Sequence, residues 1–261
     1  MSDAAPATTR PPRRRGPPRL TTVRSVDKVT PKLLRLTVAG DALEGFGPPK
    51  PGAHIKLFFP GPASDWNPKD PDAPRPPSRT YTPLHYDPAA RSMQIDFVMH
   101  GPGLAAGWVQ QAKVGDELYL AGPGGGYEMP ADIRSIVLVA DETAMPAASM
   151  VVEAVPAGCS VHALYEIPDA AEERSLSATH KVSPRWLHRG NAQASTLLER
   201  AVAELDAPED AYWWIACEAG AMRRIRAHLL KERKVAPSHI HTRGYWRLGE
   251  TNYPDHDYGD S

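Results

Sequence analysis

Hydrophobic and polar residues alternate in four short segments of the first half of the chain. The alternating apolar positions are Leu34, Leu36 and Val38; Ile55, Leu57 and Phe59; Met93, Ile95 and Phe97; and Leu118 with Leu120. A period of two, in short runs bounded by Gly and Pro, predicts antiparallel strands with one buried face. We therefore expect residues 20–128 to form a small antiparallel β-barrel.

The pattern changes after the glycine-rich segment 122–127. Residues 136–140, with the sequence IVLVA, are apolar throughout, as expected for a parallel strand covered on both faces. Further helix and strand patterns follow over 143–155 (helix), 161–167 (strand), 194–205 (helix), 212–217 (strand), 218–234 (helix) and 239–246 (strand). This order predicts an α/β domain over 129–250, with a parallel sheet that places ligands at the carboxyl ends of its strands.

Three segments lack either pattern. Residues 1–19 are rich in Pro and Arg and are predicted to be a disordered arm, with contact to nucleic acid or an acidic partner as the open alternative. The Pro-rich residues 61–78 are expected to form a surface loop. Residues 251–261 are expected to be a C-terminal tail.

Composition narrows the functional classes. The chain has 30 Lys plus Arg and 31 Asp plus Glu, so a net charge of -1 gives no general attraction to nucleic acid or anionic membrane. The 2 cysteines cannot supply the four thiolates of a typical iron–sulfur cluster. No apolar stretch approaches the roughly 20 residues that span a bilayer. We expect a cytoplasmic monomer that acts on a small molecule, without nucleic acid and without membrane insertion.

Two segments of the barrel half carry candidate chemistry. In SRTYTPL (78–84), Arg79 can pair with a diphosphate, Tyr81 can stack on a ring system and Thr82 can form hydrogen bonds, although ordinary sheet surface is the alternative. In GPGLAAGW (101–108), small residues at a predicted helix start expose N–H groups that suit a diphosphate. The preceding His100 is either a ligand contact or an ordinary histidine of the core or of a turn.

Two further segments lie at the predicted carboxyl ends of strands in the α/β half. They are Asp141, Glu142 and Thr143 after the first strand, and Cys217, Glu218 and Ala219 after the third. Both can face a nucleotide, and both can equally cap helices. The G-x-G-x-x-G fingerprint of a standard dinucleotide fold is missing after the first strand.

The order of these motifs carries a resemblance. RTYTPL, IDFVMHGPGLAAGW, GDELYLAGPGGGY, VLVADETAMPA, WWIACEAGAMRRIRAHL and GYWRLG together resemble the siderophore-interacting protein family, relatives of the ferredoxin reductases, over roughly residues 20–250. The resemblance implies a flavin-binding barrel that precedes a nicotinamide-binding α/β domain. It also implies an FAD-dependent ferric-siderophore reductase that uses NADPH or NADH.

The resemblance assigns residues one by one. It implies that Arg79, Tyr81 and Thr82 contact the FAD diphosphate and isoalloxazine. The neighbours of the ribityl, diphosphate and adenine are then Asp96, Val98, His100, Gly101, Ala105 and Ala106. The resemblance implies that Thr143 approaches the flavin from the second domain. We expect the nicotinamide near Thr143 and the turn of Cys217, Glu218 and Ala219, and Arg223 and Arg224 are either its phosphate partners or a solvated helix face. The chain departs from many relatives at Leu84 (arginine), Leu104 (proline), Ala140 (glycine) and Cys217 (glycine).

Two basic residues are the candidates for binding the electron acceptor. Lys56 on a barrel strand and Arg247 after the last sheet strand flank the flavin in the resemblance, and we expect them to form a basic patch that attracts anionic ferric siderophores. No protein metal site is expected, because the 10 histidines form no compact ligand motif. Two alternatives stay open: a general NAD(P)H-dependent flavin oxidoreductase with another acceptor, and a non-catalytic flavin- or siderophore-binding module.

We expect the protein to purify with noncovalent FAD, and both Arg79→Ala and Tyr81→Ala to weaken FAD retention. The guanidinium would lose its diphosphate partner, and the flavin would lose its stacking ring. The ratio of flavin to protein, read from the visible spectrum, measures this, with circular dichroism as the folding control. Full FAD occupancy in both variants would contradict the assignment of this motif.

Overall fold

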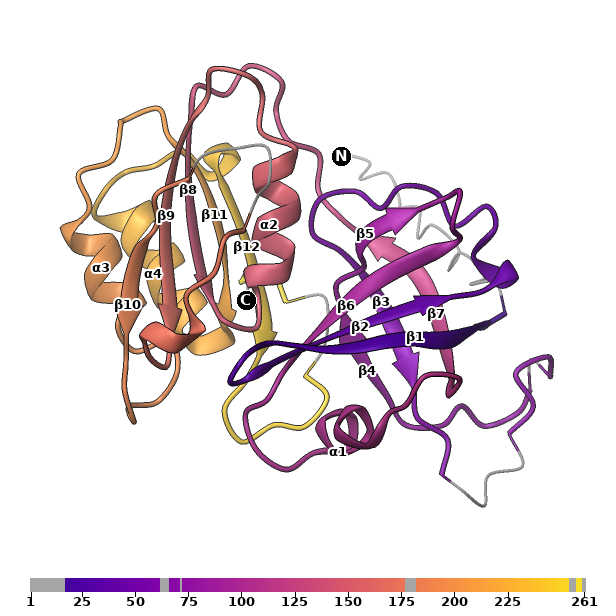
Figure 1. Cartoon of the computed structure of the whole chain (residues 1–261). Helices are drawn as coiled ribbons and strands as arrows, with labels where there is room; N and C mark the ends of the chain where they lie inside the picture. The colour runs from indigo at the N-terminus through magenta and orange to yellow at the C-terminus, as the bar shows by residue number, and fades with distance from the viewer. Residues whose placement is uncertain (1–16, 62–65, 71, 177–181, 254–256, 260–261) are drawn as a thin grey trace, which may run out of the picture.

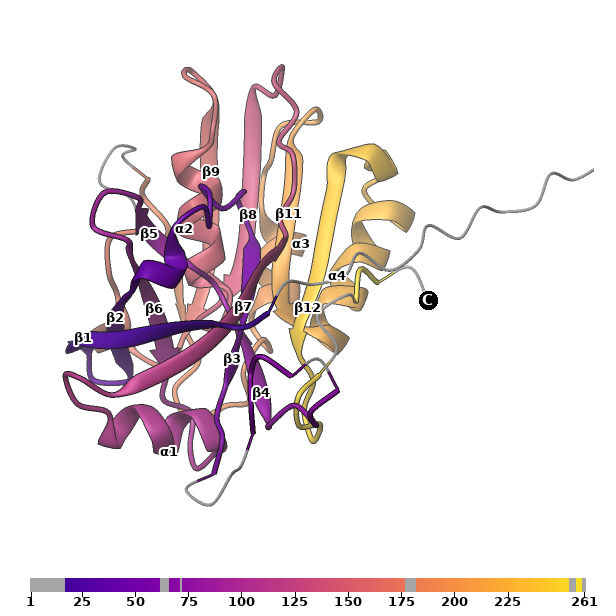
Figure 2. The same ribbon diagram turned by 90° about the vertical axis from the view of Figure 1, so that its right-hand side faces the viewer.

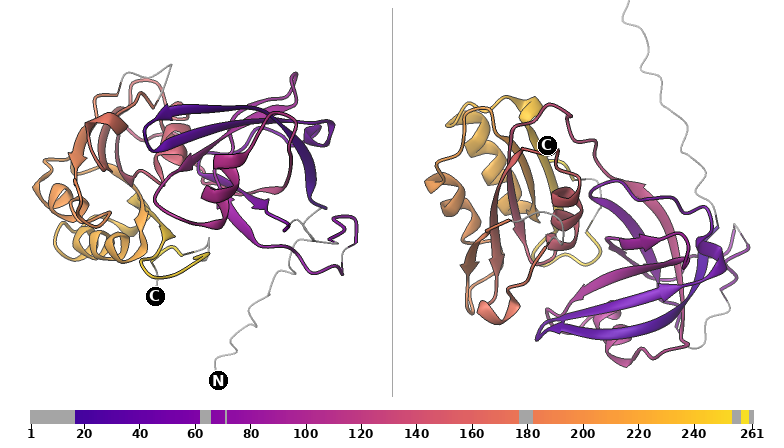
Figure 3. Two further views of the ribbon diagram at one scale, coloured as in Figure 1. Left: turned by 60° about the horizontal axis from the view of Figure 1, so that its bottom comes forward. Right: turned by 45° about the horizontal axis from the view of Figure 1, so that its top comes forward.

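The computed structural model describes residues 17–61, 66–70, 72–176, 182–253 and 257–259. These residues form two domains that lie side by side, an antiparallel one followed by a parallel α/β one (Figures 1 and 3). The first 16 residues of the predicted arm lie outside the described residues, and the first strand already begins at Arg19. The two-domain fold class predicted from the sequence is confirmed.

Seven strands make up the barrel domain. They are β1 (Arg19–Thr30), β2 (Leu33–Ala39), β3 (Ala53–Phe58), β4 (Ser78–Tyr81), β5 (Leu84–Asp87), β6 (Ser92–Val98) and β7 (Glu117–Gly125). Their order in the sheet is β4-β3-β7-β1-β2-β6-β5, with antiparallel pairing throughout. Only Thr82 and Pro83 separate the two edge strands along the chain, so these edges meet at one corner.

The predicted alternation marks the barrel core. Leu36, Val38, Ile55, Leu57 and the apolar residues of β6 and β7 are buried together, whereas Leu34 is only partly buried against them. The short turn η1 (Asp41–Leu43) and the helix α1 (Leu104–Gln111) cover this core through Leu43, Ala105 and Val109. Burial of each of these aliphatic side chains stabilises the folded state by about 1.5 to 3 kcal/mol.

The α/β domain is a five-stranded parallel sheet with helices on both faces (Figure 2). Its strands are β8 (Ser135–Asp141), β9 (Ser160–Ile167), β10 (Arg185–His188), β11 (Tyr212–Glu218) and β12 (Ile240–Trp246), in the order β10-β9-β8-β11-β12. The helix α2 (Met145–Glu153) packs on one face of the sheet. The helices α3 (Leu198–Glu204) and α4 (Ala219–Lys231) pack on the other. Short turns η2 (Ala170–Glu172) and η3 (Pro237–His239) complete the domain.

Two details of this domain differ from the prediction. The strand β10 has only four residues and was not predicted. The helix predicted over 194–205 begins only at Leu198, so its predicted start is wrong. The reason is local, because Ser195 has a positive φ of 66°, which a helix does not accept, and its polar groups bond to buried carboxylates of the sheet.

Buried polar contacts join the two domains. Glu172 of η2 is 4% exposed and accepts hydrogen bonds from the Thr30 hydroxyl and, at 2.9 Å, from the Lys32 backbone N–H at the β1–β2 turn. On the far side of the interface Arg243 of β12 lies 3.1 Å from Nδ1 of His54 of β3. The Thr82 and Tyr245 side chains also lie close to each other across the interface. The domains are therefore held together at several separated points.

The glycine-rich end of β7 makes one of these contacts sterically feasible. A Cβ at Gly125, which has a φ of 63°, would come within 2.8 Å of Nδ1 of His54. Glycine at this position thus leaves room for the His54 ring beside Arg243.

The described part of the tail packs on the α/β domain. The Asp257 carbonyl accepts a 2.9 Å hydrogen bond from the Gly244 N–H, and the Asp257 carboxylate pairs with Arg223.

We expect Glu172→Ala to lower the free energy of unfolding by about 1 to 3 kcal/mol, because the buried Thr30 hydroxyl would lose its partner and the part-buried Lys32 N–H would lose its acceptor. Thermal unfolding followed by circular dichroism measures the change. The matched control is the neighbouring Glu173→Ala, which removes only an exposed pair with His188 and should cost well under 1 kcal/mol. Equal losses in the two variants would show that the Glu172 contacts do not hold the domains together.

Candidate functional site

A cavity of about 520 Å³ lies between the two domains. Its barrel wall comes from β2, β5, β6 and the preceding loops, and its other wall comes from α2 and the segment after η2. The lining residues include Arg35, Pro83, Leu84, Tyr86 and Asp96 of the barrel and Met145, Pro146, Met150 and Arg174 of the α/β domain. The wall is mostly apolar, with the charged groups Arg35, Asp96 and Arg174 among its exceptions.

A second cavity of about 370 Å³ shares Arg174 with the first. Val98, His100 and Gly101 line it from the end of β6, and Glu142, Pro168 and Arg189 line it from the positions that follow β8, β9 and β10. The carboxyl ends of three parallel strands therefore open onto this space, where α/β sheets bind ligands. We refer to the two cavities together as the interdomain groove.

The predicted flavin residues of β6 and of the loop after it line this groove, whereas those of α1 do not. Asp96 lines the first cavity, but its carboxylate is already held by Arg35, whose Nε and Nη2 donate to it at 2.6 and 2.9 Å. Val98, His100 and Gly101 line the second cavity. The nearby Ala105 and Ala106 are buried in the first turn of α1.

The predicted flavin residues of β4 lie at the barrel corner and outside the lining of both cavities. The Tyr81 ring packs against Phe97 at a centroid distance of 4.4 Å, and burial raises the pKa of its hydroxyl. Among the described residues, Arg79 Nη1 donates to the neighbouring Ser78 carbonyl, at 2.8 Å. Thr82 is buried and lies close to Tyr245 of the other domain.

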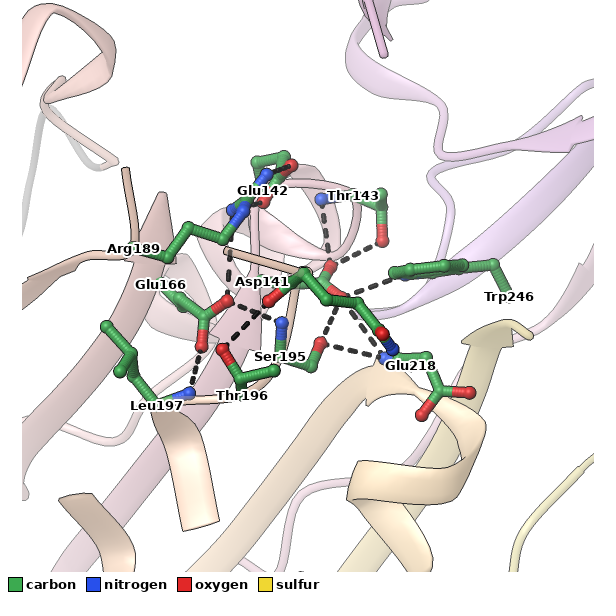
Figure 4. A network of polar contacts seen from close by, with 11 residues as sticks. Asp141, Glu142, Thr143, Glu166, Arg189, Ser195, Thr196, Leu197, Glu218 and Trp246 are labelled. Carbon is green, nitrogen blue, oxygen red and sulfur yellow. Dashed lines mark hydrogen bonds and ion pairs between the residues drawn. The ribbon is translucent and has the colours of Figure 1, made fainter. Parts of the chain in front are cut away.

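Asp141 is the polar centre of the α/β side (Figure 4). Its carboxylate is fully buried and accepts hydrogen bonds from the Thr143 N–H (3.0 Å) and hydroxyl (2.5 Å). It also accepts from the Ser195 hydroxyl (2.8 Å), the Glu218 N–H (3.1 Å) and the Trp246 indole (2.9 Å). One carboxylate thus fixes the positions of three strand ends and of the loop before α3.

A second charged cluster lies beside Asp141 (Figure 4). Glu166 accepts from the backbone N–H groups of Ser195 and, at 2.7 Å, Leu197, and it lies 3.9 Å from Arg189. Arg189 donates to both carboxylate oxygens of Glu142. Burial raises the pKa of both Glu142 and Glu166. The arginine offsets the burial of two carboxylates that share this edge of the sheet.

The predicted turn of Cys217, Glu218 and Ala219 is buried. Burial raises the pKa of the Cys217 thiol well above its ordinary value, so this residue is a neutral apolar group at neutral pH. The Glu218 carboxylate accepts from the Ala221 N–H at 2.8 Å and thereby caps α4, which begins at Ala219. The start of this helix is therefore already occupied by an anion of the chain itself.

Arg223 and Arg224 on α4 both have carboxylate partners. Arg223 pairs with Asp257 at 3.0 Å, and Arg224 pairs with Glu199 at 2.8 Å. A nucleotide phosphate would have to compete with these carboxylates. Within the described ranges no cluster of three metal-ligating side chains occurs. The described helices also include none that is long and apolar enough to cross a membrane.

Two protein-family models match the chain, one in each domain. The family model described as siderophore-interacting FAD-binding domain matches residues 22–127, and the one described as siderophore-interacting protein matches residues 133–249. The chain belongs to the siderophore-interacting protein family. The boundary between the two matches coincides with the change from the antiparallel to the parallel sheet.

Individual members of the siderophore-interacting protein family are similar over nearly the whole chain. An NADPH-dependent ferric-chelate reductase of Escherichia coli is 32% identical over 237 residues, which cover 86% of this chain and 91% of the relative. The ferric vibriobactin reductase ViuB of Vibrio cholerae is 31% identical over 248 residues, covering 88% and 89%. A siderophore utilization protein from T. fusca has a solved structure with a TM-score of 0.82 at 36% identity, covering 93% and 98%.

The residues of this siderophore-interacting protein fit an FAD group between the domains. The helix α1 begins after Gly103 without a side-chain cap, so its first N–H groups have no partner within the helix. A Cβ at Gly101 or at Gly103 would meet nothing within 4 Å, so the backbone there is open to a phosphate.

The two predicted acceptor residues lie apart from the cavity walls. Lys56 is a half-buried residue of β3, paired in register with Thr80 and Ala121 of the adjacent strands. Arg247 follows β12 and pairs with Glu250 at 3.2 Å. Sequence reasoning missed Arg174 and Ser195, which lie in segments without a recognisable motif. It also missed Trp246, which lies in the GYWRLG motif and which the fold brings to Asp141.

We expect Asp141→Asn to lower the free energy of unfolding by about 1.5 to 3 kcal/mol, because an amide has one acceptor oxygen and turns an N–H₂ towards groups that donate. Chemical denaturation measures the loss, and a double-mutant cycle with Trp246→Phe isolates the indole contact. Asp169→Asn is the control, since Asp169 is exposed and its carboxylate accepts, among the described residues, only from the Ala171 N–H. Additive effects of Asp141→Asn and Trp246→Phe would contradict the coupling.

Proposed function

We propose that this protein is an FAD-dependent ferric-siderophore reductase that takes electrons from NADPH or NADH and releases iron as Fe(II) in the cytoplasm. The supporting observation is the interdomain groove, where the end of β6 in the FAD-binding domain faces the carboxyl ends of three parallel strands. The names of the Escherichia coli and Vibrio cholerae relatives support the reaction and the class of acceptor.

FAD, when bound, accepts two electrons as a hydride and passes them on one at a time, which matches a two-electron donor to a one-electron ferric acceptor. The chain's own residues bind and orient the reactants. The N–H groups at the start of α1 would hold the diphosphate, and Arg79 would add a positive charge. Asp141 fixes the N–H and the hydroxyl of Thr143, which would then approach the flavin from the α/β domain.

The α/β domain supplies the proposed nicotinamide site. Cys217 is a buried neutral side chain beside Asp141 and Glu218, so it would form an apolar part of that site and carry no thiolate. The siderophore-bound iron is the substrate and arrives with its own ligands. Hard oxygen donors hold Fe(II) less tightly than Fe(III), so one-electron reduction loosens the complex. One copy of the chain supplies both walls of the groove, so the proposal requires neither a second subunit nor nucleic acid.

Lys56 and Arg247 remain our proposed acceptor residues. Lys56 is a basic side chain in the middle of β3, and Arg247 is a basic side chain directly after β12. The net charge of -1 supplies no global steering of an anionic chelate, so attraction has to come from local cations of this kind.

We expect the FAD-loaded protein to reduce ferric siderophores under anaerobic conditions, with formation of Fe(II) measured by a ferrous chelator. The assay uses a panel of ferric chelates that includes an anionic triscatecholate and a neutral complex, each with NADPH and with NADH. Rapid bleaching of the flavin without Fe(II) release from any chelate would indicate a flavin oxidoreductase with another acceptor. Absence of bleaching with both nucleotides would indicate a non-catalytic module.

The double variant Lys56→Ala, Arg247→Ala tests the two proposed acceptor residues in the same assay. We expect a higher KM for the triscatecholate complex, with a larger effect at low salt, and nearly normal reduction of the flavin by nucleotide. An equal loss towards the neutral chelate would show that these residues support the fold or the flavin and do not recognise charge.

A further inference from the structure

The first cavity of the interdomain groove lies apart from most of the predicted flavin and nicotinamide residues. Among the described residues that line it, none belongs to β4, to α1 or to the turn at the end of β11. Asp96 does line it, but the Asp96 carboxylate accepts from Nε and Nη2 of Arg35. At about 520 Å³ the cavity has the volume of a small-molecule site. It therefore has room for a ligand other than FAD.

Arg174 lines this cavity and has hydrogen-bond donors that the chain does not use. The residue follows η2, and its Nη1 donates to the Glu172 carbonyl at a long 3.5 Å. Its Nη2 is buried and has no hydrogen-bond partner among the described residues. Burial lowers the pKa of Arg174, which reflects the cost of holding the charge there. The guanidinium therefore has capacity for an acceptor that enters the cavity.

The carboxylates around Arg174 are engaged with other groups. Asp96 and Glu142 each bind a different arginine, and Glu172 accepts from the β1–β2 turn. These three carboxylates attract Arg174 only at longer range. Glu153 also lines the cavity, but it is exposed to solvent, which screens its charge. Since a buried donor without a partner is costly, an anion in the cavity accounts best for this arginine.

A second buried donor lies within electrostatic reach of Arg174. Tyr165 of β9 is fully buried in the core under α2, and its hydroxyl has no hydrogen-bond partner among the described residues. Burial raises the pKa of this hydroxyl, and the charge of Arg174 opposes the rise. The hydroxyl is therefore protonated at neutral pH and can donate. An O–H and a guanidinium N–H without acceptors match the two oxygens of a carboxylate.

Most of the remaining wall of the first cavity is apolar. It comes from both domains, with Pro83, Leu84 and Tyr86 on the barrel side and Met145 and Met150 on α2. An aromatic side chain offers a flat surface to a ring, and flexible methionines adapt their shape to a ring that lies against them. The cavity thus suits a ligand that joins a flat apolar ring to one carboxylate.

We propose that the first cavity binds a small aromatic carboxylate at a site separate from FAD, with its carboxylate paired to Arg174 and its ring between the barrel and α2. Tyr165 adds a second donor to the same carboxylate. The ligand would contact both domains, so its binding would restrain their movement relative to each other. This site goes beyond the proposed function, because it requires neither bound FAD nor the reduction of iron.

The test is isothermal titration calorimetry of the FAD-saturated protein with naphthoate and with the neutral naphthylmethanol. We expect Arg174→Ala to raise the Kd for naphthoate by about tenfold or more, as for loss of a charge-assisted hydrogen bond. Tyr165→Phe should raise it by about two- to tenfold, as for loss of a neutral hydrogen bond. Naphthylmethanol should bind more weakly, and Arg174→Ala should change its Kd by less than about twofold, because no charge is lost.

Three further variants serve as controls, with circular dichroism to show that each is folded. Arg185→Ala removes an arginine of the same domain whose described ion pair is an exposed one with Glu204, and it should leave both Kd values unchanged. Arg174→Lys should retain part of the affinity for naphthoate, because it keeps the charge. Met150→Trp fills the cavity from α2 and should weaken both probes.

Four results would overturn the proposal. Neither probe binds at millimolar concentration, or naphthoate binds the wild type and Arg174→Ala equally well. An equal weakening of both probes in Arg174→Ala would show that the arginine shapes the cavity and does not pair with a carboxylate. Naphthoate that binds the apoprotein but is displaced by FAD would assign the cavity to the flavin. A protein that binds naphthoate in this way but reduces no ferric chelate would refute the proposed function alone.

Discussion

The buried carboxylate of Glu172 is the constraint on which the geometry of the groove depends. Glu172 lies on the short turn η2 of the α/β domain, and its carboxylate accepts two hydrogen bonds from the tip of the β1–β2 hairpin. A carboxylate buried at an interface is tolerated only when its oxygens are satisfied, so the two domains must keep the separation that satisfies it. The cavities exist at that separation, and Arg174 lies two residues further along the same segment.

The same principle governs the charges inside the groove. Arg35 with Asp96 and Arg189 with Glu142 are closed pairs, and Asp141 collects five donors without needing a cation. Satisfied groups hold the walls in place and have little left to offer a ligand. The groups that still have capacity are the first N–H groups of α1 and the guanidinium of Arg174. The distribution of satisfied and unsatisfied polar groups therefore distinguishes the scaffold from the binding surface.

Much of the fold could be predicted because buried positions appear in the sequence as a regular pattern of apolar residues. The alternation at Leu36, Ile55 and Ile95 predicts the barrel strands, and the apolar segment 136–140 predicts the central parallel strand. The strand β10 escaped prediction because four half-exposed residues carry too short a pattern. The start of α3 was misplaced because helix propensity over 194–197 is overridden by the bonds of Ser195 to Asp141 and Glu166.

The candidate site was predictable only in part, for a related reason. Residues such as Arg79, Val98 and Gly101 lie in motifs that the resemblance recognises, whereas Arg174 lies in a motif-free segment and gains its place only when the domains pack. The central claim is that one flavin contacts both domains. Hydrogen–deuterium exchange with and without FAD tests it most directly: the account predicts protection at residues 98–106 and also at 142–146. Protection confined to the barrel segment would contradict it.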